Sequence, residues 1–386
     1  MLSLSKHLYR VLTPVVRITV AVEMLRQAQH DVLFYSMRLL LSLLLLLANL
    51  GTCAAQTAPI PAGHVVVTTL DSKLLRGNPG GENPRRRVSV YLPAGYDAQP
   101  TRRYPVVYYL HGFTWNDSLI FNQDGMKTLL DEAIAARQIR PFILVVPNEQ
   151  TRYGGSWYAN SATNGPWAEF TARELVAFVD KNFRTLAKPG SRGLAGHSMG
   201  GGGTVRLALQ YPGTWAAAYA LSPAFLGPHP SYLPGAGVPQ ALRATSAAPA
   251  QWPHAVFSAV SLARAFSPDP RARPFGADLP GGLGADSLAR RDAVLQRWVL
   301  ASPIYTLPTH AAALRQLRGF AFDWGAQDEV KHIPPTCKYF NDLLTVYSIS
   351  HTAEEYEGTH GSRIMGRTGR VYQHVLPFFN QYLDFD

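Results

Sequence analysis

The stretch LAGHSMGGGG, residues 194–203, constrains the fold of this chain more than any other feature of its sequence. It sets Ser198 among small residues and ends in four consecutive glycines. Glycine gives up side-chain contacts and costs backbone entropy on folding, so a packed element does not collect it without a reason. The run predicts either a flexible loop or a backbone that is sharply bent and closely approached around Ser198.

The context of Ser198 favours the sharp bend. Residues 196–200 fit the pattern G-x-S-x-G, with a short predicted strand (193–196) before it and a predicted helix (199–211) after it. A strand, a tight turn and a helix in this order expose a nucleophilic serine at the apex of the turn. The free N–H groups and the positive end of the helix then point towards that serine.

The rest of the chain after residue 56 alternates apolar runs with helical patterns, which predicts an α/β fold. Several apolar runs are continuous rather than alternating, which is typical of strands covered on both faces in a mostly parallel sheet flanked by helices. Strands are predicted at 65–70, 88–92, 105–110, 142–147, 193–196, 217–221, 319–324 and 352–358. Helices are predicted at 126–137, 167–183, 199–211, 335–347 and 369–383.

Residues 223–300, after the sixth predicted strand, interrupt this alternation. They are rich in Pro, Gly and Ala and carry only a weak helical pattern at 286–300. A structureless loop of this length is improbable in a compact domain. We therefore expect an insertion that packs over one end of the sheet and can cover the site.

A serine hydroxyl needs a base to act as a nucleophile, and the base needs an orienting carboxylate. Behind a turn of this kind the chain order is Ser, acid, His. His360 follows the predicted strand 352–358 and precedes a helix, so it is favoured as the base, with His332 second.

Two aspartates are candidates for the acid. Asp328 lies in the loop just beyond the predicted strand 319–324, where it can reach a histidine on the neighbouring loop. Asp323 lies inside that strand and is the second candidate. Read alone, Asp328 also fits a solvated loop carboxylate.

The developing oxyanion needs N–H donors. One is expected from the backbone of Met199, and the other from Phe113 in the His111-Gly112-Phe113 loop after the third strand. The candidates for lining an acyl or aromatic pocket are three aromatic residues, Trp115, Trp157 and Tyr158. An ordinary place in the hydrophobic core is an equal alternative for them.

The N-terminal part of the chain predicts export. Met37 and Arg38 precede the apolar run 39–50 and small residues around Ala55, which together indicate a signal peptide over 37–55. The apolar run is too short for a stable membrane span. We expect translation to start at Met37, with 1–36 as an extension upstream of the true start, or else an irregular N-terminal arm.

The mature domain is then 56–386, in a secreted or periplasmic protein. Its one cysteine is Cys337, so no internal disulfide is expected. Lipid attachment at Cys53 is the weaker alternative, because Thr52 stands where a lipoprotein signal normally has Gly, Ala or Ser.

Composition narrows the function classes. Charged residues make up 16% of the chain, which disfavours a disordered or coiled-coil protein. The net charge is +10, but apart from Arg85–Arg87 the basic residues are scattered, unlike the stripe of a nucleic-acid binder. No cluster of histidines and carboxylates suggests a metal, and we expect no cofactor.

Six segments resemble the α/β-hydrolase superfamily, and more narrowly the putative-esterase group with esterase D (S-formylglutathione hydrolase), bacterial feruloyl esterases and mycolyltransferases. They occur in the family's order, at 86–97, 104–113, 155–161, 196–203, 325–330 and 357–360. The resemblance implies Ser198, Asp328 and His360 as nucleophile, acid and base. Many relatives carry a glycine-rich run after His-Gly, where this chain has residues 113–115 instead.

We therefore expect a secreted serine carboxylic-ester hydrolase that acts through an acyl-serine on a small-molecule or polysaccharide-linked ester. Acyl transfer to a sugar or another alcohol would use the same intermediate, and the sequence does not separate the two reactions. A non-catalytic secreted binding module on a hydrolase scaffold is the alternative from another class, although such a protein would usually have lost a member of the triad.

Overall fold

The structure, a computed structural model, describes residues 62–229, 237–243, 252–281 and 287–386, with single residues and short runs between 19 and 41. The chain divides into two units, Met1–Pro59 and Ile60–Asp386. The described residues of the first unit are helical and exposed. Within the described parts, no helix is both long and apolar enough to span a membrane. The predicted signal peptide beyond residue 41, including Cys53, lies outside the described residues.

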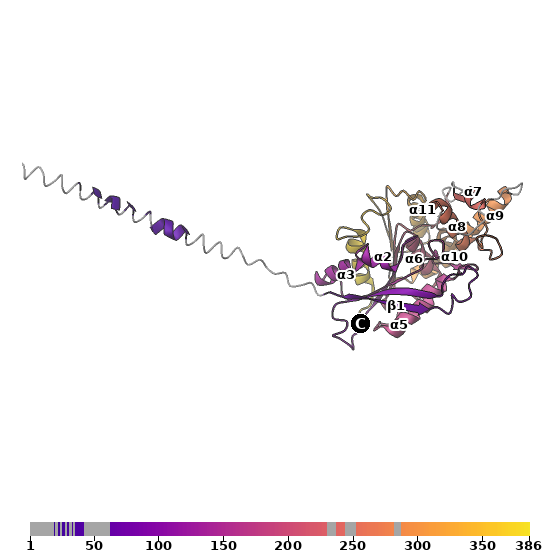
Figure 1. The fold of residues 1–386 in the computed structure, drawn as a ribbon, viewed down its shortest axis with the longest axis horizontal. Helices are drawn as coiled ribbons and strands as arrows, with labels where there is room; N and C mark the ends of the chain where they lie inside the picture. The colour runs from indigo at the N-terminus through magenta and orange to yellow at the C-terminus, as the bar shows by residue number, and fades with distance from the viewer. Residues whose placement is uncertain are drawn as a thin grey trace, which may run out of the picture. The chain divides into compact units, whose positions relative to one another are not determined.

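An eight-stranded sheet forms the centre of the second unit, in the order β1-β2-β4-β3-β7-β8-β9-β10 (Figure 1). The strands are β1 (His64–Asp71), β2 (Arg85–Leu92), β3 (Val106–Leu110), β4 (Ile143–Pro147), β7 (Arg192–His197), β8 (Ala217–Leu221), β9 (Gly319–Gly325) and β10 (Thr352–Tyr356). The β1–β2 and β2–β4 pairs are antiparallel, and the others are parallel. All eight predicted strands and the mostly parallel sheet are confirmed.

The continuous apolar runs predicted these strands because both faces of the sheet are buried. In β3, Val106, Tyr108 and Leu110 belong to one hydrophobic core, whereas Val107 and Tyr109 belong to the core on the opposite face. Successive side chains of a strand point to opposite faces, so burial on both sides requires apolar residues at every position.

Helices cover both faces. The α2, α3, η5 and α12 helices contribute side chains to the core that contains Val107, and the remaining helical segments except η2 contribute to the other core. The helical segments are α2 (Asp117–Asn122), α3 (Met126–Ala135), α4 (Trp167–Glu169), the π-helical turn η1 (Phe170–Leu175), α5 (Val176–Asn182), η2 (Pro189–Ser191), α6 (Met199–Gln210), α7 (Gly237–Leu242), α8 (His254–Phe266), α9 (Ser287–Leu300), α10 (Pro303–Arg315), α11 (Ile333–Val346), the π-helical turn η5 (Val371–Val375) and α12 (Leu376–Tyr382). The five predicted helices are present, two of them with a π-helical turn inside.

Three helices lie in the described parts of the insertion, and only α9 among them matches a predicted pattern. The α8 sequence HAVFSAVSLARAF is buried at Val256 and at every residue from Val260 to Phe266, so it lacks the polar stripe by which a surface helix is recognised. The α7 helix has six residues and is too short to show a period. The small β5–β6 pair (Asn160–Ser161 and Gly165–Pro166) was unpredicted for the same reason.

The consecutive glycines allow the backbone of α6 to pack directly against the backbone of neighbouring segments, with no side chain between them. A Cβ at Gly200 would lie 2.0 Å from the carbonyl oxygen of Leu110, at the end of β3. At Gly202 it would lie 1.9 Å from the Ala224 oxygen, in the segment that follows β8. Any side chain at these positions would push the helix away from the strand ends.

We predict that Gly202→Ala lowers the free energy of unfolding by about 3 kcal/mol or more, because the added methyl group cannot be accommodated without moving α6. This loss outweighs the gain of about 1 kcal/mol that alanine brings to a helix interior. Urea unfolding followed by circular dichroism measures the change. The matched control is Gly361→Ala, where a Cβ would meet no atom within 4 Å. Equal stability of the two variants would contradict the prediction.

Candidate active site

Ser198 occupies a strained turn between β7 and α6. Its backbone angles are φ 60° and ψ −117°, a region that non-glycine residues rarely adopt. Hydrogen bonds hold the turn: the Ser198 N–H donates to the Leu221 oxygen, and the Ser198 oxygen accepts from the N–H groups of Gly202 and Ala224, each at 2.9 Å. The turn is thus fixed by β8 and its following segment as well as by α6.

Ser198, His360 and Asp328 form a continuous hydrogen-bonded line. The Nε2 atom of His360 lies 2.8 Å from Ser198 Oγ, and its Nδ1 atom lies 2.8 Å from Asp328 Oδ2. The Asp328 side chain is fully buried, and its other oxygen accepts the Val330 N–H at 2.8 Å. The structure therefore brings together the three residues predicted as nucleophile, base and acid, from loops that follow β7, β9 and β10.

The two second candidates occupy other environments. Asp323 is buried within β9, where it accepts hydrogen bonds from Arg370 at 2.8 Å and from the Tyr219 hydroxyl at 2.7 Å. His332 immediately precedes α11, and its Nε2 atom accepts the Phe225 N–H at 3.3 Å. Neither residue takes part in the line through Ser198.

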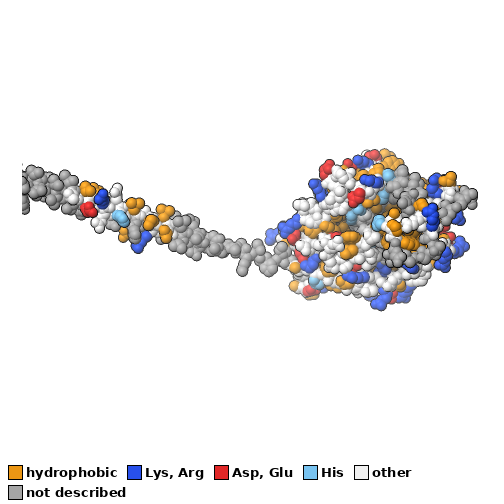
Figure 2. All heavy atoms as spheres, turned by 45° about the horizontal axis from the view of Figure 1, so that its top comes forward, with side chains coloured by type: hydrophobic (Ala, Val, Ile, Leu, Met, Phe, Trp, Pro, Cys, Tyr) orange, Lys and Arg blue, Asp and Glu red, His pale blue; other side chains and the backbone are white. Residues whose placement is uncertain are grey.

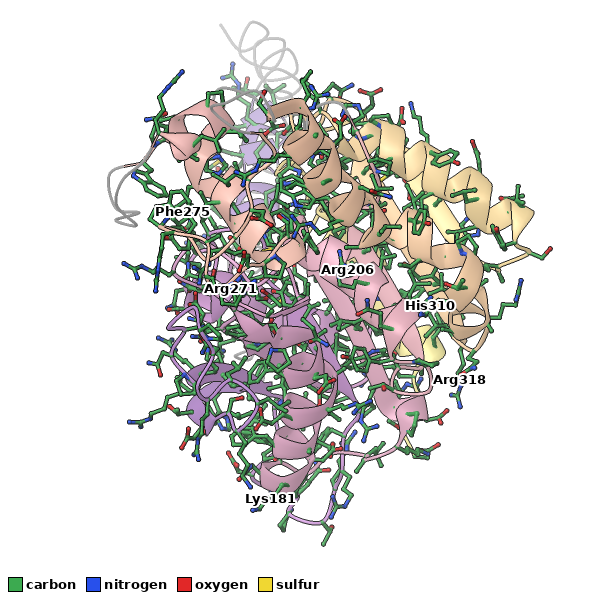
Figure 3. The ribbon with its side chains drawn as sticks, turned by 90° about the vertical axis from the view of Figure 1, so that its right-hand side faces the viewer. Lys181, Arg206, Arg271, Phe275, His310 and Arg318 are labelled. Carbon is green, nitrogen blue, oxygen red and sulfur yellow. The ribbon has the colours of Figure 1, made fainter. Side chains whose placement is uncertain are left out.

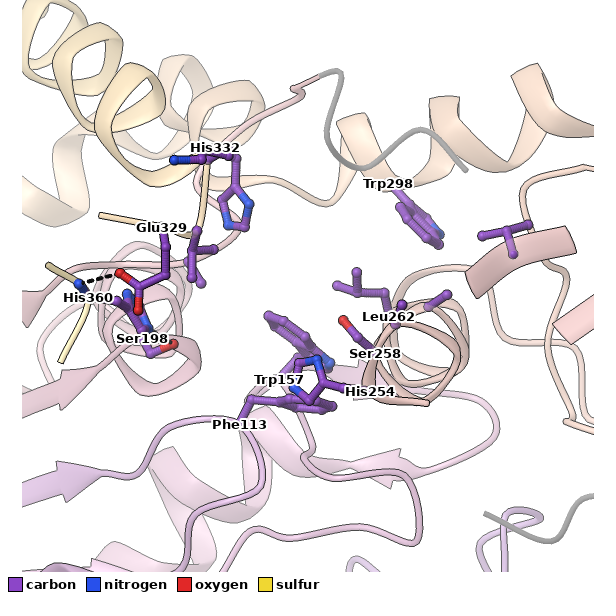
Figure 4. Close-up of a pocket in the computed structure, with 16 residues that line it drawn as sticks. Phe113, Trp157, Ser198, His254, Ser258, Leu262, Trp298, Glu329, His332 and His360 are labelled. Atoms are coloured by element: carbon purple, nitrogen blue, oxygen red, sulfur yellow. Dashed lines mark hydrogen bonds between the residues drawn. The ribbon is translucent and has the colours of Figure 1, made fainter. Parts of the chain in front are cut away.

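Two residues to which the sequence analysis gave no role, His197 and the loop acid Glu329, fix the backbone of His360. His197 Nε2 donates to the His360 carbonyl oxygen at 2.9 Å, and the two rings lie 4.8 Å apart. Burial and the neighbouring His360 lower the pKa of His197 to about 3, so the ring is neutral at physiological pH. A carboxylate oxygen of Glu329 accepts the His360 N–H at 3.0 Å (Figure 4). In the sequence, the only indication of their role is that His197 is next to Ser198 and Glu329 is next to Asp328.

The loop after β3 lies against Ser198, as the oxyanion-hole prediction requires. A Cβ on Gly112 would lie 3.5 Å from Ser198 Cβ. The Thr114 N–H donates to Gly154, whereas none of the hydrogen bonds among the described residues uses the Phe113 N–H. Met199 is the first residue of α6, where N–H groups have no acceptor inside the helix. Both predicted donors therefore adjoin the serine, and their role remains a prediction.

His111 holds this loop in place. It is fully buried, its Nδ1–H donates to the Gly112 oxygen at 2.8 Å, and its Nε2 accepts the Glu149 N–H at 2.9 Å. Burial lowers the pKa of His111 to about 4, which keeps the ring neutral and able to accept. The Tyr158 hydroxyl donates to the His111 oxygen at 2.9 Å. Tyr158, proposed from sequence for the pocket, is fully buried and supports the loop instead.

Two cavities meet at Ser198, and both are bounded by Phe113 and His360. One, of about 500 Å³, extends under the insertion (Figure 4). Its wall includes Trp157, and from the insertion Val238, His254, Ser258, Leu262 and Trp298. The other, of about 440 Å³, extends towards Trp115, Ile364 and Met365. The structure thus places two of the three candidate pocket aromatics on a cavity wall, one in each cavity.

Charged side chains are spread over the surface. On the face drawn in Figure 2, Lys and Arg lie among acidic and apolar residues and gather in no single stripe. Several basic residues pair with acids, such as Arg367 with Glu132 at 2.7 Å and Lys338 with Glu355 at 2.7 Å. Within the described ranges, no group of three or more His, Cys, Asp or Glu side chains is arranged to hold a metal ion.

A family model described as Putative esterase matches residues 82–295, which is more than half of the chain. An esterase of Mycobacterium tuberculosis is 36% identical over 145 residues, covering 36% of this chain and 28% of that protein. An endo-1,4-beta-xylanase/feruloyl esterase of Xylanibacter ruminicola is 36% identical over 135 residues, covering 32% of this chain and 18% of that protein. The matches thus span under a third of these relatives' lengths.

Solved structures share the fold at low sequence identity. A ferulic acid esterase superposes with a TM-score of 0.58 at 19% identity, covering 83% of this chain and 99% of the other. An S-formylglutathione hydrolase from Agrobacterium tumefaciens gives a TM-score of 0.55 at 17% identity, covering 85% of this chain and 98% of the other. The chain therefore has the α/β-hydrolase fold, as predicted.

We predict that His111 makes the protein sensitive to acid. A free imidazole has a pKa near 6.5, so between pH 6.5 and 4 the unfolded chain binds a proton at this position that the folded chain excludes. Stability therefore falls over that interval, by about 3 kcal/mol for a pKa of about 4. Urea unfolding of the wild type and His111→Gln at pH 7 and pH 4 isolates the loss of stability that comes from His111, because glutamine keeps a hydrogen-bond acceptor but does not titrate. A difference between the two proteins that does not change with pH would contradict the assignment.

Proposed function

The chain belongs to the putative-esterase family, and from that premise we propose that it is a serine carboxylic-ester hydrolase that acts through an acyl-serine intermediate. The observation that carries the proposal is the continuous line from Ser198 Oγ through the His360 ring to Asp328, with both contacts at 2.8 Å. This arrangement lets the imidazole remove the serine proton while the buried carboxylate holds the ring in the required tautomer.

In the first step, Ser198 Oγ attacks the ester carbonyl carbon and His360 Nε2 takes its proton. Asp328 stabilises the imidazolium that forms and does not itself take the proton. Negative charge develops on the former carbonyl oxygen, and the N–H groups of Met199 and Phe113 are the proposed donors to it. Donors of this kind are worth about 3–4 kcal/mol each in transition-state stabilisation.

The tetrahedral intermediate then collapses. The bond from carbon to the leaving alcohol breaks, the alcohol oxygen takes the proton from His360, and the acyl group remains on Ser198. Water next attacks this acyl-serine with His360 as base, which releases a carboxylic acid and restores the hydroxyl. His197 donates to the His360 carbonyl, and Glu329 accepts the His360 N–H. These two hydrogen bonds keep the imidazole in one position through both steps.

The two cavities that meet at Ser198 are similar in volume, so one can hold the acyl group of an ester and the other its alcohol group. This favours a bulky substrate in which the two groups are of comparable size. The cavity under the insertion has an aromatic floor, with Phe113 stacked on Trp157 at 5.7 Å between ring centroids, and suits an apolar or aromatic group. The names of two similar proteins include feruloyl or ferulic acid esterase. We propose a small-molecule or polysaccharide-linked ester as the substrate class.

We also propose that the protein is exported, on the strength of the predicted signal peptide over 37–55. Detection of a mature chain that begins near residue 56 in the medium or periplasm would support export, and retention of the intact precursor in the cytosol would oppose it.

We predict that Ser198→Ala lowers kcat for short-chain p-nitrophenyl esters at least about a thousandfold and abolishes the initial burst of nitrophenol, because no acyl-enzyme can form. The measurement is stopped-flow release of nitrophenol by residues 56–386, with folding checked by circular dichroism. The control is Ser348→Ala, at an exposed serine before the amino end of β10, which should retain wild-type kinetics.

A Ser198→Ala variant that keeps the burst would refute the acyl-serine mechanism. The same reaction run with and without a sugar acceptor identifies the product, as a free acid for hydrolysis or a sugar ester for transfer. A well-folded wild type that turns over none of the tested esters would favour the non-catalytic binding module.

A further inference from the structure

Arg206 is a buried cation on α6, two helical turns beyond Ser198. The residue is 5% exposed. Its Nη1 donates to the Ala301 carbonyl oxygen at 2.6 Å, and its guanidinium carbon lies 4.8 Å from the centroid of the Phe266 ring. Its Nε–H is buried and has no hydrogen-bond acceptor among the residues that the structure describes. The guanidinium therefore has fewer partners than its five N–H donors need.

Arg206 differs from the other buried arginines because no acidic charge acts on it. Like Arg206, Arg86 makes no ion pair with the described residues, but nearby carboxylates oppose the fall in its pKa that burial causes. Arg264 pairs with Glu82 at 3.2 Å, and Arg370 pairs with Asp323 at 2.8 Å. Among the described ion pairs, none includes Arg206. Burial alone lowers its pKa, to about 10, with no acidic neighbour to oppose the shift. A buried charge without a counter-charge destabilises a protein by several kcal/mol, so an arginine in this state needs an anion from elsewhere.

A cavity of about 540 Å³ opens beside Arg206 on the face shown in Figure 3. It lies between α6, which carries Arg206, and the packed helix α10, which carries His310. Arg173 and Asn160 add further hydrogen-bond donors to the wall, and Glu169 is the one carboxylate among the residues that line it. The guanidinium of Arg173 lies 5.7 Å from the centroid of the Tyr211 ring, so its N–H groups remain able to donate to a ligand. His310 uses its Nδ1–H on the Thr306 oxygen.

We propose that this cavity is an anion-binding site, separate from the ester-hydrolysing site, in which Arg206 holds a small oxyanion. The shared ligand chemistry is a group with two or more oxygens in the geometry that a guanidinium fork accepts, as in phosphate, sulfate or a carboxylate. Arg173 at the rim adds positive charge and N–H donors. The proposal does not depend on the esterase activity.

The test uses the thermal stability of residues 56–386 in sodium phosphate, sulfate, acetate or chloride at one ionic strength. An anion that binds only the folded protein raises Tm with a saturable dependence on its concentration. We expect phosphate or sulfate to raise the wild-type Tm by about 3 °C or more over chloride. A rise with acetate alone would identify a carboxylate as the ligand, and calorimetric titration of the effective anion should give one site per chain.

The variant Arg206→Met keeps the apolar stem and removes the charge. In chloride it should be at least as stable as the wild type, because an unpaired buried charge is gone. In the anion that raises the wild-type Tm, the Tm of Arg206→Met should not rise. The wild type should then be the more stable of the two proteins, the reverse of their order in chloride. The control is Arg271→Met, where the side chain is 94% exposed and should leave the anion response unchanged.

Arg206→Lys covers the case in which the methionine variant does not fold. It keeps the charge but lacks the planar fork, and it should bind the anion at least about tenfold more weakly. No anion-specific rise in the wild type, or an equal rise in the wild type and both Arg206 variants, would overturn the proposal. Because the readout is Tm and calorimetry, these outcomes are independent of whether Ser198→Ala abolishes ester hydrolysis.

Discussion

The close contact between α6 and the ends of the neighbouring strands determines the geometry of Ser198, on which the rest of the site depends. The left-handed backbone of Ser198 costs about 1–3 kcal/mol and persists only where its surroundings hold it. The holding groups are backbone groups of Leu221 and Ala224, and they reach Ser198 only because the glycines packed against them, Gly201 and Gly202, carry no side chain. The glycine run is therefore a requirement of packing, and the position of the Ser198 hydroxyl results from it.

Strain is concentrated around this turn. Of the nine described non-glycine residues with positive φ, six lie in the turn itself or in the loops and segments that surround it: Thr114, Trp157, Tyr158, Ser198, Ser222 and Phe225. Such conformations cluster at functional sites, where surrounding contacts compensate for their cost. Here the contacts include the Tyr158 hydroxyl on the His111 oxygen and the stacking of Phe225 on Phe266 at 4.2 Å. The insertion thus stabilises the core at the place where it also lines the cavity.

The sheet and the line through Ser198 could be predicted from sequence because each depends on a local pattern and on chain order. Continuous apolar runs identified the strands, and the order Ser198, Asp328, His360 selected one acid and one histidine that the structure places in contact. Their catalytic roles remain predictions.

Other features depend on contacts between distant segments, which no local pattern records. The α8 helix was missed because its partners bury most of its circumference. For Tyr158 the pocket and the core stayed equal alternatives, because sequence position says nothing about which way the ring faces. The hydrogen bond of Glu329 is to a residue 31 positions away in the sequence, and that of Arg206 is to a residue 95 positions away. An unpaired buried charge becomes visible only when the fold shows which groups surround it.

Covalent labelling of the protein by a fluorophosphonate, followed by peptide mass spectrometry, identifies the residue that carries an activated nucleophile. The account predicts one phosphonyl group per chain, on Ser198, and a loss of labelling in His360→Ala, because the serine needs the imidazole as its base. A label on another residue, or an unlabelled and well-folded wild type, would contradict the claim that the strained turn presents an activated nucleophile.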